Sequence, residues 1–188
     1  MQQTGSVPNN IILIGFMGCG KSTVGRELHR LLGYPLVDMD ALIEERAGMP
    51  ITRIFADDGE TKFRDMESSL LEELAQARQS GHIIATGGGV VGRPQNRELL
   101  QRLGYVVWLC APASVILNRT RNSGERPLLL TEDPATRIHK LLAEREPWYA
   151  ETAHLKVDTA GLSSREIAAG ILESARYFFA DPTQCKQR

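Results

Sequence analysis

The sequence predicts an α/β protein of three layers (α/β/α), in which a five-stranded parallel sheet lies between two layers of helices. Two observations lead to this fold class. Short apolar runs alternate along the chain with longer segments of helical periodicity, and this β-then-α order produces parallel strands joined by crossover helices. The apolar runs are almost continuous, as is typical of strands buried on both faces. The expected strands are residues 11–14, 35–38, 83–86, 106–110 and 155–157.

The first strand and the first helix have the clearest local patterns. Residues 11–14 read Ile-Ile-Leu-Ile, a β-branched run typical of a buried strand. Residues 21–32 place Val24, Leu28 and Leu32 about one turn apart, which predicts an amphipathic helix. The other expected helices are residues 39–47, 60–79, 95–103, 113–121, 134–149 and 163–178.

Length and composition predict one soluble domain over residues 1–188, with its core at about residues 10–179. The formal net charge of −1 gives no general attraction to nucleic acid or to anionic membranes. No apolar run is long enough to span a membrane, and the N-terminus lacks a secretory pattern. Three widely spaced cysteines (Cys19, Cys110 and Cys185) fit reduced thiols better than disulfides or a zinc site. We therefore expect a cytoplasmic protein that binds neither nucleic acid nor membranes.

Residues 15–22 match the phosphate-loop pattern G-x-x-x-x-G-K-[ST] at every fixed position. The pattern also stands in the required context, after an expected strand and before an expected helix. Its glycines allow backbone N–H groups to converge on phosphate oxygens, and the helix N-terminus adds partial positive charge. Lys21 can reach the terminal phosphates of a nucleotide and Ser22 can ligate Mg²⁺. The alternative is a glycine-rich turn that happens to precede a helix, and in either case Cys19 occupies a variable position.

Two aspartates follow the second expected strand, where parallel α/β sheets bind their ligands. One of them, Asp38 or Asp40, could serve the Mg²⁺ shell while the other accepts a hydroxyl proton from an acceptor substrate. The alternative is that either residue caps the helix that begins nearby.

Three consecutive glycines, Gly87, Gly88 and Gly89, follow the third expected strand. A plain turn rarely needs three glycines, so the run suggests that a ligand lies against bare backbone. The alternative is a flexible surface loop.

Arg64 and Glu67 lie three residues apart on one face of an expected helix. In the functional interpretation, Glu67 orients Arg64, which grips an anionic group of the substrate in a fork. The alternative is a surface ion pair of little energetic value. Arg126 and Arg145 are further candidate ligands of an anion.

Residues 121–133 connect two expected helices through turn-forming residues and an Arg-Pro pair. Long connections without secondary structure are often functional in compact domains, so we expect a mobile lid here. An ordinary long connection is the alternative.

Together these motifs resemble the shikimate kinase family, and the resemblance covers nearly the whole chain, from residue 10 to about residue 178. The phosphate loop alone occurs in many unrelated proteins, whereas the full set in this order is specific to the family. The matching segments are Gly15–Thr23, Asp38-x-Asp40, Ile54-Phe55, Phe63-Arg64, Thr86-Gly-Gly-Gly89, Arg126-Pro-Leu128 and Arg145-Glu-Pro-Trp-Tyr149.

The resemblance implies a P-loop kinase fold and transfer of the γ-phosphate of ATP to the 3-hydroxyl of shikimate, with Mg²⁺ as cofactor. It implies a monomer that binds shikimate through a region at about residues 38–68 and through later residues. The implied catalytic residues are Lys21, Asp40 and Arg126. The implied nucleotide-binding residues are Gly18, Cys19, Gly20, Lys21, Ser22, Thr23, Arg119 and Arg126, with Ser22 and Asp38 serving the metal. The implied shikimate-binding residues are Asp40, Phe55, Phe63, Arg64, Gly87, Gly88, Gly89 and Arg145.

Two other functions compete with this interpretation. One is a related small-molecule kinase, such as a gluconate or nucleoside-monophosphate kinase, which would not be expected to carry the Thr86–Gly89 and Phe63-Arg64 motifs together. The other is a regulatory module that binds a nucleotide without transferring phosphate. Lys21, Asp40 and Arg126 count against it, provided that the fold brings them together.

Overall fold

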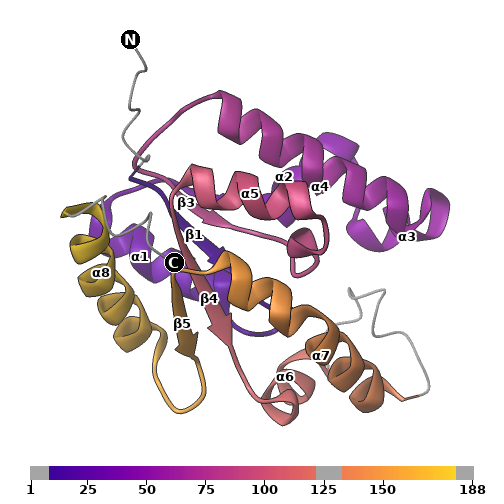
Figure 1. The fold of residues 1–188 in the computed structure, drawn as a ribbon. Coiled ribbons are helices and arrows are strands. Elements are labelled where there is room, and N and C mark those ends of the chain that lie inside the picture. Colours follow the sequence, from indigo (N-terminus) through magenta and orange to yellow (C-terminus); the bar gives the residue numbers. More distant parts are fainter. Residues whose placement is uncertain (1–8, 122–132, 181–188) are drawn as a thin grey trace.

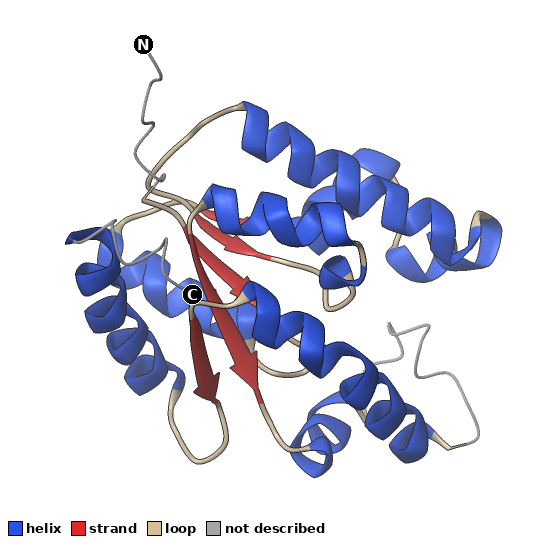
Figure 2. Cartoon of the chain, viewed as in Figure 1, coloured by secondary structure: helices blue, strands red, loops and turns tan. Residues whose placement is uncertain are grey.

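The computed structural model describes residues 9–121 and 133–180. Within these ranges five parallel strands form one sheet, as the sequence predicts, and their order is β2-β3-β1-β4-β5 (Figures 1 and 2). The strands are β1 (Ile11–Ile14), β2 (Leu36–Asp38), β3 (Ile83–Ala85), β4 (Tyr105–Cys110) and β5 (Leu155–Asp158).

Helices cover both faces of this sheet (Figure 2). They are α1 (Lys21–Leu32), α2 (Met39–Ala47), α3 (Ile51–Asp57), α4 (Gly59–Gln76), the 3₁₀ turn η1 (Val90–Gly92), α5 (Pro94–Leu103), α6 (Ala113–Thr120), α7 (Pro134–Thr152) and α8 (Ser164–Ala180). None of the helices in the described ranges is long and apolar enough to cross a membrane.

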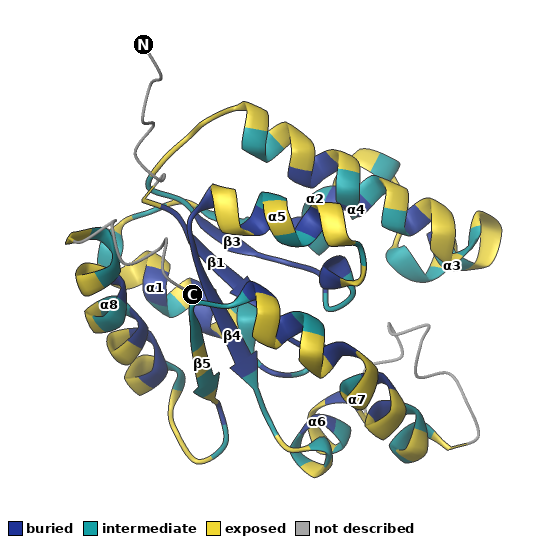
Figure 3. Ribbon diagram, in the orientation of Figure 1, coloured by how far each residue is buried: buried dark blue, intermediate teal, exposed yellow. Residues whose placement is uncertain are grey.

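Alternation along β1 divides the core into two layers. Ile11 and Leu13 pack with α1 and α8, whereas Ile12 and Ile14 pack with α2, α4, α5 and α7. All four residues are buried, and the central strands are dark blue in Figure 3 while the outer faces of the helices are yellow. The near-continuous apolar runs therefore arise because both faces of the strands are covered.

The strand order places the candidate motifs side by side. The connection after β1 runs toward β2 and the connection after β3 runs toward β4, so the two connections cross opposite faces of the sheet. At such a switch point a crevice opens at the carboxyl ends of the strands. The phosphate loop follows β1, Gly87–Gly89 follow β3, and Asp38 ends β2. Three motifs that are far apart in sequence thus meet at one edge.

The sequence assigned no element to residues 48–59, where the structure has helix α3. The local signal is weak because α3 has only seven residues, and three of them (Ile51, Thr52 and Ile54) are β-branched. The Ile51 N–H donates to the Glu44 carboxylate at 2.8 Å. The acceptor for this N–H at the start of α3 thus comes from another helix, and no local sequence pattern reveals such a partner.

His154 joins the start of β5 to β4 and to α8. Its Nδ1 accepts a hydrogen bond from the Val106 N–H at 2.9 Å, so the neutral ring carries its proton on Nε2. The ring stacks on Tyr105 with 5.8 Å between centroids and packs against Phe178. Burial lowers the pKa of His154.

This environment predicts a loss of stability in mild acid. A histidine whose pKa is lower in the folded state stabilises the fold above its unfolded pKa of about 6.5. That contribution disappears as the pH falls through about 6.5 toward the lower folded value. We expect Tm to drop between pH 7.5 and pH 5, and to drop less in His154→Asn, whose side-chain oxygen can accept from Val106 without titrating. An equal drop in both proteins in pH-dependent thermal denaturation would contradict this role of His154.

Candidate active site

The phosphate loop forms an anion cradle at the end of β1. Gly15, Gly18 and Gly20 all have positive φ, and Gly20 caps the start of α1 in the left-handed conformation. The first turn of α1 contains no acidic residue that would neutralise the positive end of the helix dipole. Backbone shape and helix dipole therefore favour an anion at this point.

Lys21 points back over the loop that precedes it. Its Nζ donates to the carbonyl oxygens of Gly15 at 2.8 Å and Phe16 at 3.0 Å. These two bonds place a positive charge at the mouth of the anion cradle, and no acidic residue of the described ranges forms an ion pair with it. The ammonium group is therefore placed where the phosphates of a nucleotide would need it.

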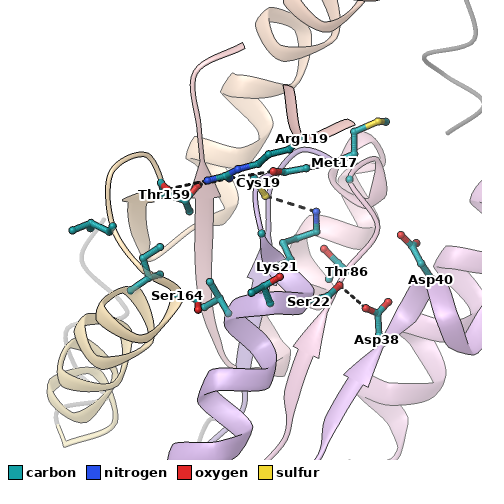
Figure 4. Close-up of a pocket in the computed structure, with 17 residues that line it drawn as sticks. Met17, Cys19, Lys21, Ser22, Asp38, Asp40, Thr86, Arg119, Thr159 and Ser164 are labelled. Atoms are coloured by element: carbon teal, nitrogen blue, oxygen red, sulfur yellow. Dashed lines mark hydrogen bonds between the residues drawn. The ribbon is translucent and has the colours of Figure 1, made fainter. Parts of the chain in front are cut away.

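Ser22 and Asp38 provide oxygen ligands for a cation. The Ser22 hydroxyl donates to Asp38 Oδ2 at 2.7 Å, which links α1 to the end of β2 (Figure 4). The other oxygen, Asp38 Oδ1, accepts from the Ala41 N–H at 3.4 Å and caps α2. Asp38 can thus cap α2 with one oxygen and still offer the other oxygen to a cation. A hydroxyl and a carboxylate beside an anion cradle fit Mg²⁺, which takes oxygen ligands and usually keeps several waters.

A cavity of about 490 Å³ runs along these groups. Figure 4 shows Asp40 at one end of it and Arg119 and Thr159 at the other, and Gly88 and Leu162 also line it. The Arg119 guanidinium donates to the Gly18 carbonyl at 3.2 Å and to the Thr159 hydroxyl at 3.2 Å. It therefore ties the phosphate loop to the loop between β5 and α8.

The glycine run after β3 lies tightly against charged side chains. A methyl group at Gly87 would collide with Glu67 Oε1 and would lie 2.8 Å from Asp40 Oδ1. A methyl group at Gly89 would collide with the Arg64 guanidinium. These glycines are needed because two carboxylates and one guanidinium occupy the space that side chains would fill.

Arg64 and Glu67 form a buried pair, which excludes the surface ion pair that the sequence left open. Arg64 Nη1 lies 2.6 Å from Glu67 Oε2, and the Glu67 side chain is only 1% exposed. On its other edge Arg64 contacts Glu60 at 2.8 Å. Burial raises the pKa of Glu67, and Arg64 opposes that rise. The pair therefore holds a guanidinium in a fixed position next to Gly89.

Arg145 reaches the same backbone from α7. It is buried, its Nη1 donates to the Gly88 carbonyl at 3.0 Å, and its guanidinium lies 5.6 Å from the centroid of the Phe16 ring. Two arginines on different helices, Arg145 buried and Arg64 partly buried, thus flank the glycine run. Such a pair can bind one carboxylate of a small substrate.

Phe55 and Phe63 form an aromatic contact between α3 and α4. Their ring centroids are 5.0 Å apart, and the Arg64 guanidinium lies 5.2 Å from the centroid of Phe63. An apolar wall beside the guanidinium would lower the local dielectric and strengthen its attraction for an anion.

Most of the residues singled out in the sequence gather at this edge of the sheet. The exception is Arg126, which lies outside the described residues together with most of the expected lid at 121–133. Among the residues of the site that were not singled out are Thr159 and Tyr149. Thr159, which holds Arg119, carries no signal in the sequence. Tyr149 donates to the Gly88 carbonyl and stands at the end of a matching motif, so the motif could have indicated it.

Comparisons with known proteins show the family of the chain. The family model for shikimate kinase matches residues 17–176. A shikimate kinase from Halorhodospira halophila is 48% identical over 167 residues, which are 89% of this chain and 93% of that protein. The solved structure of a shikimate kinase from Acinetobacter baumannii in complex with shikimate has a TM-score of 0.86 at 40% identity, covering 92% of this chain and 94% of that one. The chain belongs to the shikimate kinase family.

Family membership confirms the resemblance and the three-layer P-loop kinase fold expected from the sequence. As a member of the shikimate kinase family the chain is an enzyme that uses ATP, so the alternative of a regulatory module without transfer loses its support. A gluconokinase from Sinorhizobium meliloti 1021 has a TM-score of 0.52 at 21% identity and covers 94% of this chain and 98% of its own. A likeness of that degree shows the common fold alone.

Proposed function

We propose that the chain transfers the γ-phosphate of ATP to the 3-hydroxyl of shikimate, giving shikimate 3-phosphate and ADP. The observation that carries this proposal is one continuous cavity that joins the phosphate loop to Asp40 and Gly88, beside the buried Arg145 and the partly buried Arg64. Shikimate has one carboxylate and three hydroxyls. The arginines Arg64 and Arg145 suit the carboxylate, and Asp40 suits the hydroxyls.

In this mechanism the shikimate 3-hydroxyl oxygen attacks the γ-phosphorus while the bond to the β,γ-bridging oxygen breaks. Asp40 takes the hydroxyl proton, and ADP leaves with the bridging oxygen. Lys21 and the N–H groups of the loop neutralise the charge on the transferred group. Bound Mg²⁺ would further neutralise phosphate charge, held by Ser22 and, through water, by Asp38. The protein mainly positions the two substrates.

The nucleotide lies along the rest of the cavity in this proposal. Gly18, Cys19, Gly20, Lys21, Ser22 and Thr23 line the phosphate part, while Arg119 and Leu162 line the far end, which suits the base. Arg126 would approach the transferred phosphate from the segment 121–133, acting as a lid that excludes water.

We also propose a monomer with one domain that works in the cytoplasm. Within the described ranges, Leu31, Leu162 and Tyr177 are the exposed large hydrophobic residues, and they lie on different helices or loops. Three such side chains are too few to form a broad apolar patch for self-association within the described ranges. Light scattering after gel filtration should give a mass near the 20.8 kDa of the chain, and a mass of twice that value would contradict the monomer.

The test of the proposed function is ADP release from ATP and Mg²⁺ with shikimate, with gluconate and with a nucleoside monophosphate. We expect turnover with shikimate at least about a hundredfold above the other acceptors, because only shikimate matches both the arginines and Asp40. Preferential turnover with another acceptor would retain the kinase and overturn the proposed pocket. ATP binding without any transfer would overturn the proposed reaction.

A further inference from the structure

Tyr149 is a buried residue that the mechanism above does not use. It lies on α7 one helical turn after Arg145, so both side chains leave the same face of the helix. It is 1% exposed, and its ring stacks on Trp108 of β4 with 5.6 Å between centroids. Its hydroxyl donates a hydrogen bond to the Gly88 carbonyl oxygen.

That carbonyl oxygen receives two donors from α7. Arg145 Nη1 donates to it at 3.0 Å, and Tyr149 supplies the second bond. A carbonyl oxygen has two lone pairs, so these donors use its full accepting capacity and fix the direction in which it points. The Gly88 carbonyl is therefore held toward α7.

Holding the carbonyl also sets the next N–H group. The peptide between Gly88 and Gly89 is trans, since no cis peptide occurs in the described residues. In a planar trans peptide the N–H points opposite to the C=O. The Gly89 N–H is therefore directed away from the two donors of α7. Glycine has no side chain to restrict this peptide, so external bonds must fix it.

Tyr149 stays a donor throughout the working pH range. Burial raises the pKa of its hydroxyl well above the usual range, and the Arg145 guanidinium opposes that rise only in part. The hydroxyl therefore keeps its proton, and its bond to Gly88 does not depend on pH near neutrality.

We propose that Tyr149 is a positioning residue for the acceptor substrate, which orients the Gly88–Gly89 peptide and, through the shared carbonyl, the Arg145 guanidinium. This inference rests on the proposed function, because it assumes that Arg145 and the glycine run bind the carboxylate and hydroxyls of shikimate. Tyr149 itself does not touch the substrate. We expect its effect mainly on acceptor binding, because it holds the backbone that follows β3, whereas the phosphate loop follows the neighbouring strand β1.

The chain offers a matched control in Tyr105. Its ring is also buried, at 3% exposure, and its hydroxyl also makes a hydrogen bond, to the Ser174 hydroxyl at 2.6 Å. Tyr105 lies at the start of β4, the end of the strand opposite to the site. Tyr105→Phe and Tyr149→Phe each remove one buried hydroxyl and keep the ring, so a general effect of losing such a bond appears in both.

The experiment measures kcat, both KM values and Tm for the wild type, Tyr149→Phe and Tyr105→Phe, together with calorimetric Kd values for shikimate and ADP. In Tyr149→Phe we expect KM and Kd for shikimate to rise about five- to tenfold, the worth of one hydrogen bond. The values for ATP and ADP should stay within about twofold. Tyr105→Phe should keep the wild-type affinity for both substrates.

Two results would overturn the inference. One is an unchanged shikimate Kd in Tyr149→Phe. The other is an equal loss of affinity for shikimate and for ADP that follows a lowered Tm, since that pattern indicates a purely structural role. The wild-type assay separates this inference from the proposed function. If the wild type does not phosphorylate shikimate, the proposed function is wrong. If the wild type turns over normally and Tyr149→Phe is unaffected, only the role of Tyr149 is contradicted.

Discussion

Replacing Lys21 with alanine is expected to lower kcat by about two to three orders of magnitude or more, while the fold survives. Charge accumulates on the transferred phosphoryl group in the transition state, and a preorganised positive group there contributes on this scale. The Lys21 ammonium is already held at the loop by the Gly15 and Phe16 carbonyls. It therefore needs little reorganisation when the nucleotide arrives, and alanine removes the charge altogether.

The fold should tolerate this change because the Lys21 side chain lines the open cavity, where water can replace the lost donor. Lys140→Ala is the matched control, since Lys140 is exposed on α7 and its loss removes the same charge elsewhere. The measurements are steady-state kinetics with shikimate and thermal denaturation of both variants. Near-normal turnover in Lys21→Ala would contradict the phosphate role, and a collapse of Tm would show that Lys21 mainly supports the loop.

The parts of the site that the sequence predicts are contiguous or follow from strand order. The phosphate loop is one continuous segment, and the structure has the expected strand before it and the expected helix after it. The meeting of Asp38 and the glycine run with that loop follows from the rule that ligands bind at the carboxyl ends of parallel strands. These features depend on local chemistry and topology, so the residue order is sufficient to predict them.

The remaining features depend on tertiary packing. The sequence left Arg64 and Glu67 open between a surface ion pair and a substrate grip, because spacing on a helix does not reveal what covers that face. Burial of Glu67 against Gly87 excludes the surface ion pair. The contact of Tyr149 with Gly88 spans 61 residues, and the cap that Glu44 provides to α3 comes from another helix. No local pattern encodes such partners.

The buried pair predicts two separate effects of Arg64→Ala. The first is on the acceptor: loss of a charge-assisted fork to the shikimate carboxylate should raise KM for shikimate by about a hundredfold, with little change in KM for ATP. The second is on stability. Removing Arg64 leaves the Glu67 carboxylate buried without its closest cation, and breaking a buried pair in this way costs about 3–5 kcal/mol.

A second substitution separates these effects. In Arg64→Ala/Glu67→Gln the buried group is a neutral amide, so most of the lost Tm should return, whereas the affinity for shikimate should stay low because the guanidinium is still absent. Kinetics and thermal denaturation of the two variants and of Glu67→Gln alone measure both quantities.

If the double variant recovers shikimate affinity together with Tm, Arg64 acts only by neutralising Glu67, and the carboxylate of the substrate must bind elsewhere. If KM for ATP rises as much as KM for shikimate, the division of the cavity into nucleotide and acceptor parts is wrong. The effects on stability and on shikimate binding can be separated because Arg64 has two kinds of neighbour. On its own helix it contacts the buried Glu67 carboxylate, and from β3 the glycine backbone of the proposed substrate site approaches it.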